Sequence, residues 1–281
     1  MKKGAAKDGR PWSSAAAHRL RRIAGDPPTM ENAVQIVIGR FLDGVDCPPT
    51  DLDALGARLK VTGIIREDLP FSGELRRNSK GFEIACSSHL SASRQRFTVA
   101  HELAHVIFET TGPNCPTRGK ELERLCDMLA SEILMPQDKF MTVADADLRI
   151  EKLFDISRIF KTSLAATAIR CAQLFGHSVF EVKGALVTWG YGVVKKGPIS
   201  RLDEYLQRAV EKALKGQNGE ETLVVHAGLL RKWNVQYRSL ARDGRALFLM
   251  KQIRGANASA TSSGSRNEQV SLFTSLDRSS S

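Results

Sequence analysis

Residues 94–109 read RQRFTVAHELAHVIFE, and residues 101–105 within them are His-Glu-Leu-Ala-His. Residues four apart lie on one face of a helix, so His101 and His105 can offer two ring nitrogens to one ion. Zinc takes about four ligands, and a catalytic site leaves one place for water. Glu102 is rotated about 100° from His101 and can reach that water as a general base without binding the metal. The stretch therefore predicts a helix that bears the zinc centre of a peptide hydrolase.

A third ligand is expected from the next helix, residues 121–135, which read ELERLCDMLASEILM. Glu123 and Asp127 are four apart and share a face. We predict that Glu123 is a metal ligand, and that Asp127 accepts a hydrogen bond from the second nitrogen of a ligand histidine and fixes its tautomer. Glu121 is expected to be solvated, and Glu132 to cap or pair near the site without binding metal. Mn²⁺ or another divalent ion could replace Zn²⁺, because this ligand set does not exclude it.

The chain around these helices indicates an α+β fold of several parts. Between residues 61 and 90, short β-rich pieces punctuated by glycine predict a small antiparallel sheet before the histidine helix. Beyond about residue 180, strand-like runs flank an amphipathic helix. The predicted parts are a basic flexible arm (1–28), a metallopeptidase domain (29–140), a helical segment packing on it (141–178), a small α+β domain (179–254) and a disordered tail (255–281).

Composition and charge limit the classes of protein to which the chain could belong. The net charge is +10, and residues 1–24 contribute +6 of it through seven Lys or Arg and one Asp. Such an arm could contact nucleic acid directly, and a solvated tail is the alternative. The apolar runs fall short of the ~20 residues that span a bilayer, so no membrane segment is expected. The five cysteines form no CxxC pair, which indicates reduced thiols and a cytoplasmic location.

Two sequence motifs follow each other closely in this chain. The histidine stretch, followed by ELERLCDMLASEILMP at residues 121–136, resembles the ImmA/IrrE family of metallopeptidase domains, over roughly residues 30–140. The resemblance implies a zincin-like fold, in which a small twisted sheet lies over two helices that include the active-site helix. The family's acidic ligand corresponds to Glu123, and its Asn or Asp position corresponds to Asp127.

The resemblance also implies a function. It suggests a zinc-dependent endopeptidase that acts on a regulator, commonly a DNA-binding transcriptional repressor, in stress response or mobile-element control. Glu102 would then activate a zinc-bound water. Zincins usually hold the peptide as an added strand on a sheet edge. GFEIACSS, residues 81–88, directly precedes the active-site helix and is the predicted edge.

Three alternatives stay open from the sequence. The five-residue motif is short enough to match by chance. A non-catalytic binding protein could retain the fold, although the intact motif and Glu123 argue against it. A DNA-associated regulator could act through the basic arm, and residues 150–174 have a mild helix-turn-helix pattern. A helical buttress of the peptidase domain is the simpler interpretation of that segment.

A further short motif lies in the predicted tail. Residues 269–273, QVSLF, resemble the peptide by which bacterial proteins dock on the DNA polymerase sliding clamp. Leu272 and Phe273 could enter an apolar pocket, while Gln269 supplies hydrogen bonds and register. A chance match, or docking of the tail on the chain's own C-terminal domain, is the alternative.

Overall fold

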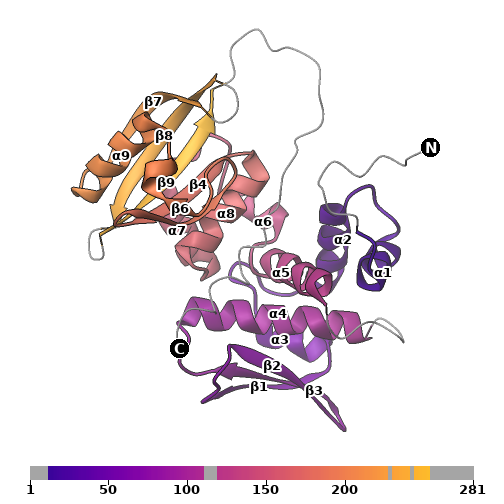
Figure 1. Ribbon diagram of the computed structural model, residues 1–281. Coiled ribbons are helices and arrows are strands. Elements are labelled where there is room, and N and C mark those ends of the chain that lie inside the picture. The colour runs from indigo at the N-terminus through magenta and orange to yellow at the C-terminus, as the bar shows by residue number, and fades with distance from the viewer. Residues whose placement is uncertain (1–11, 111–118, 227–229, 241–243, 254–281) are drawn as a thin grey trace. The chain divides into compact units, whose positions relative to one another are not determined.

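The structure is a computed structural model that describes residues 12–110, 119–226, 230–240 and 244–253 (Figure 1). The clamp-like motif with Gln269, Leu272 and Phe273, and residues 1–11 of the basic arm, lie outside this part of the chain. Docking on a sliding clamp therefore stays a prediction.

The chain divides into two compact units. The N-terminal unit takes its described residues from 10–143 and 156–166, and the C-terminal unit takes them from 144–155 and 167–281. Helices α7 (Lys152–Phe160) and α8 (Leu164–Phe175) each contribute residues to both units. None of the helices within the described residues is long and apolar enough to cross a bilayer.

A three-stranded sheet forms one layer of the N-terminal unit. Its strands are β1 (Val61–Glu67), β2 (Gly73–Asn78) and β3 (Gly81–Ser87), in the order β1-β3-β2. Strands β2 and β3 are antiparallel, as expected for a hairpin, whereas β1 runs parallel to β3. The prediction of a purely antiparallel sheet is therefore wrong. The chain leaves β1, crosses to the far side of the sheet and returns as the hairpin, which makes β1 and β3 parallel.

Strand β3 is the centre of this sheet and not its edge. The predicted substrate-binding edge at residues 81–88 is therefore wrong, because β3 is hydrogen-bonded on both sides. Its consecutive residues Ile84, Ala85 and Cys86 are all buried. Such burial on both faces is typical of a central strand. The free edges of the described sheet belong to β1 and β2.

Helices cover the sheet and extend the unit. The long helix α4 (Ala92–Thr110) contacts β2 and β3, and α5 (Lys120–Leu134) packs against α4. Leu122, Leu125, Leu129 and Ile133 of α5 are buried, which confirms its predicted apolar face. Further helices of this unit are α2 (Met30–Leu42), α3 (Leu52–Arg58) and α6 (Gln137–Phe140).

The predicted flexible arm contains a packed helix. Helix α1 (Ala15–Ala24) begins at the N-cap Ser14 and contacts α2 and α5, so the prediction of a flexible arm over residues 1–28 is wrong for this stretch. Ala16, Ala17 and Leu20 are buried at helical spacing. The arginines of α1 are less buried than this apolar side, so composition alone hid the packed face.

A six-stranded antiparallel sheet frames the C-terminal unit, in the order β6-β5-β4-β9-β8-β7. Helix α9 (Glu204–Leu214) packs on this sheet through Leu206, Val210 and neighbouring apolar residues. The sheet and α9 lie within residues 179–254 apart from the first residue of β4, and the unit also includes residues from 144–155 and 167–178. The strands are β4 (Ser178–Lys183), β5 (Leu186–Tyr191), β6 (Gly197–Pro198), β7 (Gly219–His226), β8 (Leu230–Leu240) and β9 (Arg245–Gln252).

Gly73 lets strand β2 approach helix α4 closely. A Cβ atom at this position would overlap Cγ2 of Thr98 on α4 and lie 2.9 Å from the carbonyl oxygen of Ala85. Since the second obstacle is backbone of the central strand, Gly73→Ala should lower the free energy of unfolding by about 1–3 kcal/mol. Gly63→Ala on β1 is the control, because a Cβ there meets nothing within 4 Å. Equal free energies of unfolding in chemical denaturation of the two variants would contradict this close packing.

Candidate metal centre

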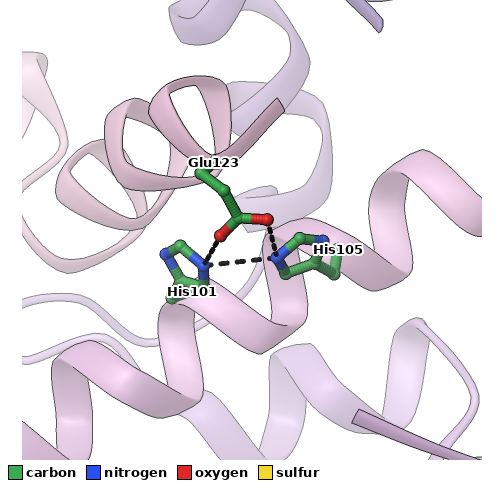
Figure 2. A group of neighbouring side chains, drawn as sticks. All are labelled: His101, His105 and Glu123. Carbon is green, nitrogen blue, oxygen red and sulfur yellow. Dashed lines mark hydrogen bonds and ion pairs between the residues drawn. The ribbon is translucent and has the colours of Figure 1, made fainter. Parts of the chain in front are cut away.

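Three side chains from α4 and α5 converge on one point of the N-terminal unit (Figure 2). His101 and His105 lie one turn apart on α4, and their Nε2 atoms are 3.2 Å apart. The carboxylate of Glu123 faces both rings, with Oε2 3.2 Å from Nε2 of His101 and Oε1 3.7 Å from Nε2 of His105. The structure thus brings together the three residues that the sequence predicts as metal ligands.

The spacing of these atoms fits a zinc ion. Tetrahedral bonds of about 2.0–2.2 Å separate neighbouring donor atoms by about 3.3–3.6 Å. The observed separations of 3.2 and 3.7 Å are close to these values. Two imidazoles and one carboxylate are also a donor set of catalytic zinc sites, in which water takes the fourth position. The same donors admit Mn²⁺.

Asp127 holds His101 from the other side of the ring. Its Oδ1 lies 3.0 Å from Nδ1 of His101, one turn further along α5 than Glu123. When Nδ1–H donates a hydrogen bond to this carboxylate, Nε2 carries the lone pair. That lone pair is directed at the point shared with His105 and Glu123. Asp127 therefore lies where the sequence predicts an orienting partner.

The charges of the centre favour a cation. Burial lowers the pKa of His101, but hydrogen bonds with Asp127 and Glu123 outweigh this and raise the pKa to about 9. Hydrogen bonds with His101 and His105 hold the pKa of Glu123 well below its ordinary range. The carboxylates of α5 thus stabilise positive charge on His101, and they would do the same for a metal ion.

Glu102 lies beside the ligand histidines and is partly buried. Burial raises its pKa; the charges of His105 and His101 oppose this, and those of Glu123 and Glu74 add to it. A carboxylate with a raised pKa accepts a proton more readily near neutral pH, as a general base requires. Glu74 is not among the site residues predicted from the sequence. It reaches this neighbourhood through the packing of β2 on α4, which no local pattern reveals.

The other two acids of α5 have structural partners. Glu121, predicted to be solvated, accepts a hydrogen bond of 2.9 Å from the backbone N–H of Ser14 at the start of α1. Glu132 is buried, and its carboxylate accepts a hydrogen bond from the backbone N–H of Gln137 at the start of α6. Glu132 is therefore a capping residue, one of the roles expected for it.

Zinc binding by this centre should depend on pH. A ligand imidazole must be unprotonated. In the metal-free protein, however, a pKa of about 9 leaves His101 protonated at neutral pH. Zinc then displaces a proton, and its affinity should rise about tenfold per pH unit up to about pH 9.

The stability of the metal-free protein should change in the opposite direction. The contribution of protonated His101 to stability is full below the ordinary pKa of 6.5 and is lost as the pH rises through about 9.

Chelator competition at several pH values measures the zinc affinity. Asp127→Asn should flatten the pH dependence of that affinity. A wild-type affinity that does not change with pH would contradict the assignment of His101.

Comparisons with known proteins support the same class of domain. The model of the peptidase M78 family, described as the IrrE N-terminal-like domain, matches residues 60–172. The match begins later than the resemblance predicted over residues 30–140, and it extends through most of α8. No curated protein sequence matches the chain significantly.

One solved structure supports the fold. A Mycobacterium tuberculosis transcriptional regulator is similar to the chain with a TM-score of 0.50 and 14% sequence identity, over 78% of this chain and 75% of that one. At this identity the similarity supports the fold alone. The family match and the α+β architecture together support a metallopeptidase domain of the ImmA/IrrE type at residues 60–172.

Proposed function

We propose that this protein is a zinc-dependent endopeptidase that cleaves a regulatory protein, such as a transcriptional repressor. One observation carries the proposal: His101, His105 and Glu123 present their ligand atoms within 4.8 Å of one another, and Glu102 lies next to them on α4. A site for structural zinc would use all four ligands from the protein. The described residues supply three ligands, with Glu102 beside them on the same helix, which is the composition of a hydrolytic centre.

Each residue has a distinct part in the proposed hydrolysis. Zinc, when bound, would lower the pKa of a coordinated water and polarise the scissile carbonyl group. Glu102 takes the proton of the attacking water and passes it to the leaving amine nitrogen. Burial raises its pKa, which makes this carboxylate a stronger base than an ordinary glutamate. Asp127 keeps His101 in the tautomer with a free Nε2.

Strand β2 is the proposed platform for the substrate. It begins at Gly73 against Thr98 of α4, and Arg77 near its end forms an ion pair with Glu109 of α4. The strand therefore runs along the two helical turns that bear His101 and His105. No strand within the described residues pairs with the outer edge of β2. An extended peptide could add to that edge through backbone hydrogen bonds, which recognise the chain without selecting its side chains.

A regulatory protein is the proposed substrate class. Residues 60–172 match the family model, and the resemblance to the ImmA/IrrE family implies cleavage of a regulator. The structural neighbour is named a transcriptional regulator, which is compatible with a role in transcriptional control. The C-terminal unit, which contains none of the three converging residues, would then serve to bind a partner or an effector.

Mapping new protein N-termini in cells tests the proposal. The wild type and the Glu102→Gln variant are each expressed together with the products of neighbouring genes, and all N-termini are compared by mass spectrometry. We expect at least one new internal terminus that appears only with the wild type, in a regulatory protein. If no terminus in the proteome depends on Glu102, the endopeptidase assignment is wrong.

A further inference from the structure

The segment that precedes α1 contacts the start of α5, the helix that bears Glu123. The backbone N–H of Ser14 donates to Oε2 of Glu121 over 2.9 Å. The guanidinium carbon of Arg124 lies 4.9 Å from the centre of the Trp12 ring, which is a cation–π contact. Helix α1 itself also packs on α5. Two residues of the first turns of α5 are thus held by a segment more than one hundred positions earlier in the chain.

These contacts lie at the N-terminal end of α5, where the helix has no side-chain cap. The N-cap position, Gly119, provides no side-chain hydrogen bond to the first turn. Helix ends without caps fray, because their first backbone N–H groups lack partners in the helix. Glu123 lies in this first turn, so any fraying there would move a ligand of the metal centre.

The residues of α5 that contact the N-terminal segment and the ligand Glu123 lie on different sides of the helix. Glu121 and Arg124 are three apart and share the side of α5 that faces α1. Glu123 is rotated about 200° from Glu121 and so points to the opposite side, towards the histidines. A helical turn moves as one body, so contacts on one side determine where the side chain on the other side lies.

The contact also stabilises α1. Ser14 is the N-cap of α1, and its Oγ accepts a hydrogen bond from Ala17 N–H over 3.1 Å. The Glu121 carboxylate therefore places a negative charge at the N-terminus of α1, where the helix dipole favours it. The two helices thus stabilise each other at their N-terminal ends.

We propose that Trp12 and Glu121 are positioning residues of the metal centre, which hold the first turn of α5 so that Glu123 stays directed at His101 and His105. The inference rests on the proposed function, since it assumes that Glu123 binds zinc. It gives the N-terminal segment a part in metal binding that is separate from any contact of the basic arm with nucleic acid.

Zinc affinity and a cobalt spectrum test this role in the full-length protein. Zinc affinity is measured by chelator competition in the Trp12→Ala/Glu121→Ala double variant, and Co²⁺ absorption reports the geometry of the ligands. We expect a loss of affinity of about 10–100-fold, as for other residues that orient metal ligands, together with a changed Co²⁺ spectrum. Lys120→Ala, at an exposed position of the same turn, is the control and should leave both unchanged.

Conservative substitutions separate positioning from folding. Trp12→Phe keeps an aromatic face for Arg124, and Glu121→Gln keeps an oxygen that accepts the Ser14 N–H, so this pair should restore most of the affinity. Unchanged zinc affinity and an unchanged cobalt spectrum in the double Ala variant, with only a lower melting temperature, would show that α1 is merely structural. If the wild type binds no zinc at all, the proposed function fails first, and this inference fails with it.

Discussion

Replacing Glu102 by Gln should reduce peptide cleavage by about 10²–10⁴-fold, the range typical of a positioned proton-transfer group. The amide has nearly the shape of the carboxylate but cannot accept the proton of the attacking water. Because Glu102 is not one of the three converging ligand residues, the variant should keep its zinc and its fold. The measurement is the rate of cleavage of a verified substrate by zinc-loaded wild type and variant.

Two controls make this result specific. Glu31→Gln changes an exposed carboxylate on α2 in the same unit and should leave the rate unchanged. Equal zinc content in the wild type and in Glu102→Gln excludes loss of metal as the cause. Cleavage by the Glu102→Gln variant at the wild-type rate would mean that another group supplies the base.

Replacing His105 by Ala should abolish stoichiometric zinc binding. The change removes one of three protein ligands and leaves His101 and Glu123, which lie 3.2 Å apart, to hold the ion alone. Asp127→Ala should be milder, with a loss of affinity of about 10–100-fold, because Asp127 orients His101 without binding the metal. Elemental analysis after dialysis, followed by chelator competition, distinguishes the two degrees of loss.

The matched control is another histidine of the same unit. His89 lies on the short segment that leads into α4. It is exposed and pairs with Asp68. His89→Ala should keep one zinc per chain. Equal metal content in the wild type and in His105→Ala would overturn the ligand assignment.

The site was predictable because its geometry is mostly local. His101 and His105 are one turn apart on α4, and Glu123 and Asp127 are one turn apart on α5. Helical periodicity alone places each pair on one face. Only the meeting of the two helices had to be assumed, and their buried apolar faces provide it.

The features that escaped prediction depend on contacts distant in the sequence. Strand β3 is central because β1 pairs with it in parallel, and no pattern within residues 61–90 specifies that order. The consecutive apolar residues Ile84, Ala85 and Cys86 are the sequence signal of a central strand, and all three are buried. The partner of Glu121 lies 107 positions away, so an exposed helical acid was the natural expectation.

Helix α1 shows how composition can conceal a packed element. The arginines of residues 15–24 suggested a solvated arm, whereas Ala16, Ala17, Leu20 and Ala24 follow the period of one helical face. Periodicity was the better guide in this stretch, because small apolar residues contribute little to average hydrophobicity yet permit close helix contacts.

The position of the metal tests the central claim most directly. Crystals of the zinc-loaded protein, measured on both sides of the zinc absorption edge, reveal where the ion lies. The account predicts one strong anomalous peak per chain, contacted by Nε2 of His101, Nε2 of His105 and the carboxylate of Glu123. A zinc-loaded protein whose peak lies elsewhere, or a site at these three residues without a peak, would contradict it.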